Sequence, residues 1–258
     1  MKLATYNING VNGRLAHLLA WLDGEKPDVV CLQELKAPDA KFPHAALKQA
    51  GYHAVWKGQP ASHGVAILAR GKEPLATRRA LPGDDSDTES RYIEAAVDGV
   101  LLCCLYAPNG NPQPGPRFDY KLAWLKRLHA HAATLLAAKV PVALIGDFNV
   151  VPTDADLYDP KSSWRKDALT QPAARAAFQR LLAQGWQDAL RAKHPDDKLF
   201  TFWDYKRFAW QRDAGLRIDH FLLSPPLAKR LQAAGVDRER RGLEGASDHA
   251  PAWITLRR

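Results

Sequence analysis

Short apolar runs alternate along this chain with longer segments in which apolar residues recur every three or four positions. The short runs predict strands, and the longer segments predict helices. Strands are expected over residues 2–7, 28–33, 52–56, 64–69, 92–97, 100–106, 142–147, 218–223 and 252–256. This alternation is typical of an α/β protein whose helices pack on a sheet.

Helical spacing is clearest over residues 14–23, where leucines line one face and Gly24 is expected to end the helix. Further helices are expected over residues 118–139, 172–185 and 226–235. The dipeptide Asp98-Gly99 separates two predicted strands and predicts a tight hairpin turn. A hairpin is antiparallel, which excludes an all-parallel Rossmann sheet.

Length and composition favour a globular protein. The chain has 258 residues, of which 46% are hydrophobic, and a single domain spanning residues 1–258 is expected. The formal net charge of +8 is weak support for a polyanionic partner, because many proteins are basic only for solubility. No apolar leader follows Met1, and no uncharged apolar stretch approaches the roughly 18 residues that span a bilayer. A cytoplasmic location without membrane contact is therefore expected.

The three cysteines, Cys31, Cys103 and Cys104, all lie in apolar runs. Adjacent residues of a strand face opposite sides of a sheet, so Cys103 and Cys104 cannot chelate one ion together. We interpret all three as small buried hydrophobic residues in a reducing compartment.

Polar side chains gather at the ends of several predicted strands. Gly146-Asp147-Phe148-Asn149 follows an apolar run, and residues i and i+2 of a strand share a face. Comparable sets are Asn7 with Asn9, Gln33 with Glu34, Tyr106 with Asn109, Asp219 with His220, and Ser247 with Asp248 and His249. Carboxylates, amides, a phenol and a histidine that converge on one sheet edge suit a hydrolytic site.

Each set also has a local explanation. Asp147 and Asn149 could form an Asx turn, and the first set could be a turn before Gly10. Glu34 could simply form an ion pair with Lys36. These alternatives stay open from the residues alone.

The residue types constrain the metal. Zinc hydrolases use several His or Cys ligands, and the His-Glu-x-x-His spacing is absent from the chain. Carboxylate and amide oxygens of Glu34, Asp147, Asp248, Asn7 and Asn149 instead suit Mg²⁺ or Mn²⁺. A phosphate substrate would explain both such a metal and a basic surface.

Residues 201–212 interleave aromatic and basic side chains. Phe202, Trp203 and Trp210 can stack or wedge, while Lys206 and Arg207 can hold phosphates. Phe202 and Trp203 could equally belong to the core, but the density of the whole segment favours nucleic-acid binding.

Four motifs together resemble the exonuclease III family of apurinic/apyrimidinic endonucleases. They are Leu32-Gln33-Glu34-Leu35-Lys36, Gly146-Asp147-Phe148-Asn149 with Pro152, Gly215-Leu216-Arg217-Ile218-Asp219, and Ser247-Asp248-His249. The resemblance covers nearly the whole chain. It implies a deoxyribonuclease I-like fold, a four-layered α/β sandwich of two mixed sheets flanked by helices, with a divalent metal at one rim.

The resemblance also implies a metal site in which Glu34 is the principal ligand. The expected metal-binding residues are Asn7, Glu34, Asp147, Asn149, Asp248 and His249. Asn9 stands where some family members have an aspartate near the metal.

Catalytic roles follow from the same resemblance. Asp147 would orient or deprotonate the attacking water, and Asn149 would hydrogen-bond the attacking group or the phosphate. His249, oriented by Asp219, would contact the scissile phosphate. Tyr106 would lie near the phosphate or the leaving group.

The implied partner is double-stranded DNA with abasic sites or blocked 3′ ends, bound by a monomeric enzyme. A pocket of Phe202, Leu216 and Ile218 would take the abasic sugar, and Leu216 in place of a tryptophan resembles the bacterial branch. The residues expected to contact DNA are Asn109, Phe202, Trp203, Lys206, Arg207, Trp210, Leu216 and Ile218.

The implied reaction is Mg²⁺-dependent hydrolysis of the phosphodiester 5′ to an abasic site, which leaves a 3′-hydroxyl, with 3′-to-5′ exonuclease and 3′-phosphatase activities beside it. One alternative is a phosphodiesterase of the same fold that acts on inositol phosphates or lipids. Another is a non-catalytic nucleic-acid-binding module, which would bind with salt-dependent affinity and without turnover.

Overall fold

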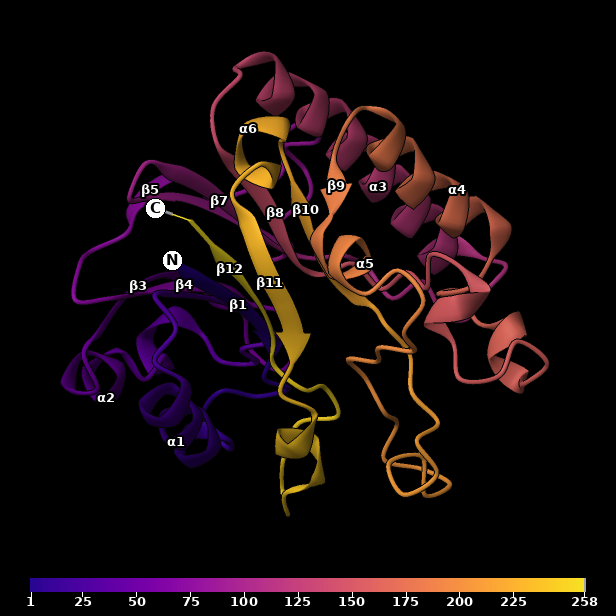
Figure 1. The fold of residues 1–258 in the computed structure, drawn as a ribbon, viewed down its shortest axis with the longest axis horizontal. Coiled ribbons are helices and arrows are strands. Elements are labelled where there is room, and N and C mark those ends of the chain that lie inside the picture. The colour runs from indigo at the N-terminus through magenta and orange to yellow at the C-terminus, as the bar shows by residue number, and fades with distance from the viewer. Residues whose placement is uncertain (258) are drawn as a thin grey trace.

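The computed structural model describes residues 1–257 and contains two six-stranded β-sheets packed face to face (Figure 1). Sheet A has the order β11 (Leu231–Val236), β12 (Ala252–Leu256), β1 (Lys2–Asn7), β2 (Val29–Gln33), β4 (Val65–Arg70) and β3 (Tyr52–Lys57). Sheet B has the order β5 (Leu75–Arg78), β6 (Tyr92–Val97), β7 (Val100–Tyr106), β8 (Val142–Asp147), β10 (Asp219–Leu223) and β9 (Gln187–Asp188). Each sheet has one parallel pair, β1 with β2 and β7 with β8, so both sheets are mixed as expected.

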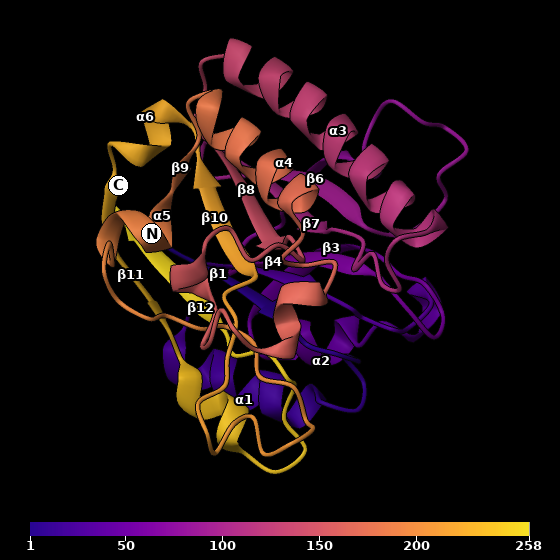
Figure 2. The same cartoon turned by 90° about the vertical axis from the view of Figure 1, so that its right-hand side faces the viewer.

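Helices cover the outer face of each sheet and complete four layers (Figure 2). Sheet A is covered by α1 (Leu15–Glu25) and α2 (His44–Gln49), and sheet B by α3 (Pro116–Ala137) and α4 (Pro172–Ala183). Shorter helical segments are α5 (Ala189–Lys193), α6 (Pro225–Ala228), η1 (Asp39–Lys41), η2 (Asp154–Asp156), η3 (Ser163–Lys166) and η4 (Arg238–Gly242). Within residues 1–257, every helix is too short or too polar to span a bilayer.

Strand alternation distributes the apolar residues among the layers. Leu3 lies in the core between the two sheets, whereas its neighbour Ala4 packs with the residues of α1. In the same way Cys104 lies between the sheets and Cys103 lies under α3, and both thiols are buried and free. The prediction that these cysteines face opposite sides of the sheet is confirmed.

Strands β1, β6, β7, β8 and β12 have the bounds that the apolar pattern predicts. The hairpin prediction is also confirmed, because β6 and β7 pair antiparallel with Val97 opposite Val100. Asp98 and Gly99 both have positive φ angles, +49° and +73°, as the turn between such closely joined strands requires.

The helix predicted over residues 226–235 is wrong. Helix α6 ends at Ala228, and β11 follows as the edge strand of sheet A. The pairing with β12 supplies hydrogen bonds that the sequence spacing cannot reveal. Gly235 pairs with Trp253 of β12 and lies under its ring, where a Cβ atom would come within 2.7 Å of the ring. The glycine therefore allows the close approach of the two strands.

Gly24 does not end α1, contrary to the prediction. The helix continues to Glu25, and Lys26 takes the left-handed position with φ +46°. Pro27 follows at once and cannot continue the helix, so proline rather than glycine sets this boundary. The short elements β5, β9, α2 and α5 were not predicted.

Strand pairing brings the polar strand ends to one rim of the sandwich. Parallel pairing places Asn7 opposite Gln33 in sheet A and Tyr106 opposite Asp147 in sheet B. Strand β10 is antiparallel to β8, so its first residue, Asp219, also pairs with Asp147. The register of these strands therefore assembles side chains that are far apart in the sequence.

Candidate active site

The polar strand ends of both sheets meet at this rim, and not at the edge of a single sheet as the sequence suggested. Asn7 of sheet A donates through Nδ2 to Asp147 Oδ2 of sheet B over 3.0 Å. Ser247, in the segment before β12, donates through Oγ to the carbonyl of Asn7 over 2.6 Å. These two hydrogen bonds join three distant parts of the chain at one place.

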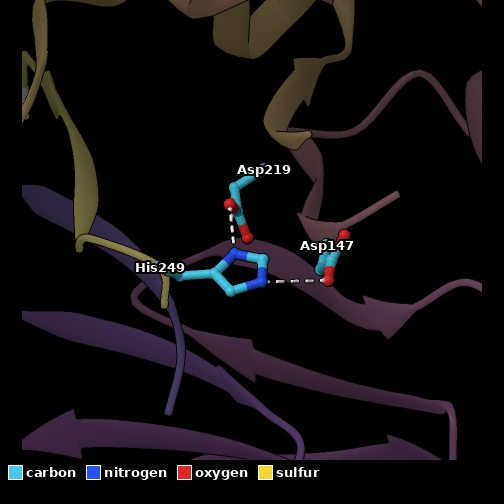
Figure 3. Close-up of side chains that lie close together, drawn as sticks. All are labelled: Asp147, Asp219 and His249. Atoms are coloured by element: carbon cyan, nitrogen blue, oxygen red, sulfur yellow. Dashed lines mark hydrogen bonds and ion pairs between the residues drawn. The ribbon is translucent and has the colours of Figure 1, made fainter. Parts of the chain in front are cut away.

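The imidazole of His249 lies between the carboxylates of Asp219 and Asp147 (Figure 3). Its Nδ1 atom is 2.8 Å from Asp219 Oδ2, and its Nε2 atom is 3.8 Å from Asp147 Oδ2. All three side chains are buried. Asp219 thus orients the ring so that Nε2 points toward Asp147.

We call Asp147, His249 and Asp219 the buried row. The charges of its two carboxylates favour a protonated His249. Burial alone would lower the pKa of His249, but the carboxylates of Asp219, Asp147 and Asp248 outweigh burial and raise the pKa to about 10. Burial, and then the charge of Asp219, raises the pKa of Asp147 to about 7. At neutral pH the imidazolium offers an N–H group on each nitrogen, while Asp147 is able to accept a proton.

A second cluster surrounds Glu34. Asn7 donates through Nδ2 to Glu34 Oε1 over 2.9 Å, and Lys36 Nζ is 2.8 Å from Glu34 Oε2. Asn9 accepts from Lys36 at Oδ1 over 2.5 Å and donates through Nδ2 to Asp248 Oδ1 over 2.9 Å. The ion pair of Glu34 with Lys36, which the sequence offered as a purely local explanation, is therefore present and forms part of this cluster. Asn9 links Lys36 to Asp248.

Asn149 has a left-handed backbone, with φ +50°, just after β8. Its N–H group donates to Asp147 Oδ1 over 2.8 Å, which is the Asx turn that was the local alternative for this motif. Its side-chain Nδ2 donates to the carbonyl of Ala107 over 2.8 Å. Gly146 allows β8 to approach β7 closely, since a Cβ atom there would collide with the carbonyl of Leu105. The turn and the site are thus built from the same groups.

Tyr106 ends β7 beside Asp147. Burial, and then the charges of Glu34 and Asp147, raises the pKa of the phenol well above its usual range, so the hydroxyl stays protonated. The guanidinium of Arg91 lies 5.0 Å from the centre of the Tyr106 ring and donates to the Tyr106 carbonyl over 3.3 Å. No motif marks Arg91 in the sequence, because its contact with Tyr106 depends on the pairing of β6 with β7.

Phe202 is the aromatic residue of the 201–212 segment that reaches the site. Its ring centre is 5.0 Å from that of His249, and Trp164 packs edge-on against it at 6.1 Å. Leu216 and Ile218 are 0% and 2% exposed in the apolar cluster beneath Phe202. They share this apolar cluster with Phe202, and the pocket of Phe202, Leu216 and Ile218 for an abasic sugar stays a prediction.

The other predicted DNA contacts differ in exposure. Trp203 is 1% exposed and donates through Nε1 to Asp213 over 3.0 Å, so it is a core residue and its predicted DNA contact is corrected. Trp210 is half-buried against it, with ring centres 5.1 Å apart. Asn109 is exposed at the rim, and its Nδ2 atom donates to Asn149 Oδ1 over 3.4 Å.

A groove of about 640 Å³ lies between segments 158–167 and 204–214. Lys206 and Arg207 line it and are exposed, as expected of phosphate-binding side chains. Trp164 lines this groove and also packs against Phe202, so the groove lies next to the rim.

The model of the endonuclease/exonuclease/phosphatase family matches residues 4–249, which include every rim residue described above. The chain belongs to this family. Exodeoxyribonuclease III of Haemophilus influenzae is 34% identical to it, and the alignment covers 100% of both chains.

Two solved structures share the architecture. The 3′ phosphatase NExo from Neisseria, bound to a product DNA hairpin, superposes with a TM-score of 0.96 at 39% identity over 100% of both chains. An AP endonuclease from Archaeoglobus fulgidus superposes with a TM-score of 0.94 at 34% identity over 99% of both chains. The chain therefore has the deoxyribonuclease I-like α/β sandwich and is an enzyme of a nuclease and phosphatase family.

The donor set of this family member fits a divalent cation. The carboxyl groups at the rim are those of Glu34, Asp147, Asp219 and Asp248, and the cationic groups among them are those of Lys36 and His249. The site thus has an excess of negative charge. Asp219 Oδ1 is buried and has no hydrogen-bond partner in the part of the chain that the structure describes. Carboxylate and amide oxygens are the ligands that Mg²⁺ and Mn²⁺ prefer.

Behind the site, Arg217 is buried between two carboxylates. It donates through Nε to Asp156 Oδ1 and through Nη1 to Asp188 Oδ2, each over 2.7 Å. Arg217 Nη1 is also 3.0 Å from His220 Nδ1, and His220 Nε2 is 3.0 Å from the carbonyl of Val150. This network ties β10 to the loop after β8 and holds two strand ends of the site together.

The network makes the free energy of unfolding depend on pH. Burial, and then the charge of Arg217, lowers the pKa of His220 to about 4, whereas an unfolded histidine titrates near pH 6.5. Between these values only the unfolded chain binds the proton, so stability is lost as the pH falls from about 6.5 to about 4, by up to about 3 kcal/mol. We expect His220→Gln to lose less stability than the wild type between pH 6.5 and pH 4, as measured by urea unfolding at each of these two pH values. His129→Gln on α3 serves as the control, and equal pH slopes in the wild type and His220→Gln would contradict the assignment.

Proposed function

We propose that this protein is a DNA repair nuclease that hydrolyses the phosphodiester 5′ to an abasic site and also processes blocked 3′ ends. One observation carries the proposal, the buried row of Asp147, His249 and Asp219 next to the carboxylate of Glu34. The ligand atoms of the row lie within 4.8 Å of one another. A proton acceptor and a positively charged donor at this spacing suit attack on a phosphodiester. The names of the relatives, an exodeoxyribonuclease III and a DNA-bound 3′ phosphatase, support DNA as the substrate.

In the proposed reaction, Asp147 orients the attacking water and accepts its proton. The N–H group of Asn149 holds the Asp147 carboxylate in place. In the proposed complex the Asn149 side-chain amide would hydrogen-bond the attacking group or the phosphate. Protonated His249 donates from Nε2 to a phosphate oxygen, and Asp219 keeps the ring in that orientation. The neutral phenol of Tyr106 donates to the phosphate or the leaving oxygen. The product strand then carries a 3′-hydroxyl.

Glu34, Asp248 and Asn7 would hold the metal. A bound Mg²⁺ or Mn²⁺ ion supplies charge neutralisation at the phosphate. His249 was expected from the sequence both as a phosphate contact and as a metal ligand. Asp219 holds its Nδ1 atom at 2.8 Å, which leaves only Nε2 for one of these two roles. We therefore assign the phosphate contact to His249 and the metal to the cluster around Glu34.

The surface beside the site is suited to duplex DNA. The formal net charge of +8 is accompanied by Lys206 and Arg207 in the groove, where they can neutralise backbone phosphates. Phe202 lies edge-on to His249 and can contact a sugar that has no base. An unpaired abasic sugar leaves the helix at lower cost than a paired nucleotide, which favours damaged sites.

Metal removal tests the proposal. A labelled duplex with one internal synthetic abasic site is expected to be cut with Mg²⁺ and left intact with excess chelator. Glu34→Gln is expected to lower the cleavage rate at least about 100-fold, because its neutral amide holds the cation poorly. The matched control is Glu239→Gln, since Glu239 is exposed on η4 away from the rim.

The same assay separates the alternatives. Equal cleavage by Glu34→Gln and Glu239→Gln would remove the assigned metal site. Binding of DNA without turnover under all metal conditions would favour a binding module, and turnover of inositol phosphates or lipids without DNA cleavage would favour the other phosphodiesterase class. A recessed 3′ end and a 3′-phosphate, assayed in parallel, measure the exonuclease and phosphatase activities against the internal cut.

A further inference from the structure

Lys121 is a buried cation beside the site that no sequence motif marks. It lies near the start of α3 and is 0% exposed. Its Nζ atom donates to two backbone carbonyls, that of Asn109 over 2.9 Å and that of Asn149 over 2.5 Å. Within residues 1–257, no carboxylate lies within ion-pair distance of this ammonium group.

A buried ammonium group without a carboxylate partner is energetically unfavourable. Burial lowers the pKa of Lys121 to about 7, and the charges of Asp147 and Asp167 offset burial only in part. A methionine side chain would occupy a similar volume without this cost, but it would leave the carbonyls of Asn109 and Asn149 without their donor. The lysine at this position is therefore tied to the placement of these two carbonyls.

The ammonium group completes the hydrogen bonding of Asn149. The left-handed backbone of Asn149, with φ +50°, is a conformation that non-glycine residues adopt at a cost. Its N–H group is held by Asp147, its side-chain Nδ2 by Ala107, and its carbonyl by Lys121. With these three contacts, and with Asn109 Nδ2 at 3.4 Å from its Oδ1 atom, the side-chain amide of Asn149 has one fixed orientation.

The loop after β7 is built to admit the same lysine. Gly110 has φ +92°, and a Cβ atom there would come within 2.6 Å of Lys121 Cδ. Asn109, the preceding residue, contacts Asn149 Oδ1 through Nδ2 over 3.4 Å. Lys121 thus joins the loops after β7 and β8 at a single point, between the two asparagines.

We propose that Lys121 is a positioning residue, which clamps the carbonyls of Asn109 and Asn149 and thereby fixes the Asn149 amide toward the reacting group. Lys121 acts through Asn149 and does not touch the substrate. The inference rests on the proposed nuclease function. It requires that loss of the lysine affect the chemical step and leave substrate binding nearly intact.

Lys121→Met is compared with Lys126→Met, which removes an exposed lysine from the same helix. Both are assayed with Mg²⁺ on the abasic duplex and on a recessed 3′ end. We expect Lys121→Met to lower kcat about 10- to 100-fold, as for a displaced reacting group, with KM within about threefold of wild type. Lys121→Arg keeps a cationic donor and is expected to lose less. Hydrogen exchange of the peptide containing Asn149 should become faster in Lys121→Met but not in Lys126→Met.

A kcat of Lys121→Met equal to that of Lys126→Met, or a loss that lies entirely in KM, would overturn the proposal. If Lys121→Met is insoluble, the polar variant Lys121→Gln takes its place under the same criteria. Wild-type protein that cleaves neither substrate would instead overturn the proposed function, and this inference with it. The two failures are therefore distinguishable.

Discussion

Replacement of Asp147 by asparagine is expected to lower kcat for cleavage of an abasic duplex by about 1000-fold, with little change in DNA affinity. A positioned general base contributes a factor of this order, and the amide cannot accept the proton. Asp147 is buried between the N–H donors of Asn7 and Asn149, and its pKa is raised to about 7 by burial and then by Asp219. Single-turnover cleavage rates and fluorescence anisotropy with labelled duplex measure the two effects separately.

The control for this prediction is Asp196→Asn, because Asp196 is exposed and lies outside the rim. It is expected to cleave and bind as wild type does. If Asp147→Asn retained wild-type kcat to within a few-fold, Asp147 would not be the group that accepts the proton. A loss of DNA affinity equal to the loss of kcat would indicate instead that the carboxylate serves to bind substrate.

Replacement of Arg217 by methionine is expected to lower the free energy of unfolding by about 3–5 kcal/mol, because it leaves the buried carboxylate of Asp188 without its arginine partner and Asp156 with Arg191 alone. The side chains of Arg217 and Asp156 are 1% and 0% exposed, and that of Asp188 is 8% exposed. Burial opposes ionisation of Asp156, yet Arg217 holds the pKa of this carboxyl at about 2. Urea unfolding at neutral pH measures the loss.

Arg175→Met is the matched control for the stability prediction. Arg175 forms an ion pair with Asp154 at 2.8 Å, but the Asp154 side chain is 65% exposed. An exposed pair contributes between about 0 and 1 kcal/mol, so this variant should remain close to wild type. Equal losses of unfolding free energy in the two variants would show that the buried Arg217 network stabilises the protein no more than an exposed ion pair does.

The local contacts predicted for the polar strand ends are present in the same residues that meet at the rim. The Asx turn of Asp147 and Asn149 is present, and so is the ion pair of Glu34 with Lys36. Each local contact uses one part of a side chain or the backbone, and the remaining polar atoms face the site. The local contacts are therefore confirmed, and the sequence could not show that the same residues also meet at the rim.

Residues that act through distant partners were not predicted. Lys121 contacts the carbonyls of Asn109 and Asn149, which lie 12 and 28 positions away in the chain. Arg91 reaches the ring of Tyr106 only because β6 pairs with β7. Neither residue belongs to a motif, since a motif records neighbours in sequence and these contacts join neighbours in space.

The substrate-contacting residues show the same limit. The sequence places Phe202 and Trp203 side by side with equal claims to surface and core. The structure separates them, because Phe202 packs at 5.0 Å from His249 while Trp203 is 1% exposed in the core. Adjacent residues in an irregular segment have no fixed periodicity, so burial there depends on the surrounding layers.

By itself, the sequence determined the α/β class, the bounds of the strands with the strongest apolar runs, and the residues that can carry the chemistry, among them Asp147 and His249. Apolar periodicity and residue type are local properties, and they can be read along the chain. Only the tertiary structure decided that the rim belongs to two sheets, that β11 is a strand, and that Lys121 and Arg91 lie behind the site. These features depend on strand pairing and burial, which bring together residues that the chain keeps far apart.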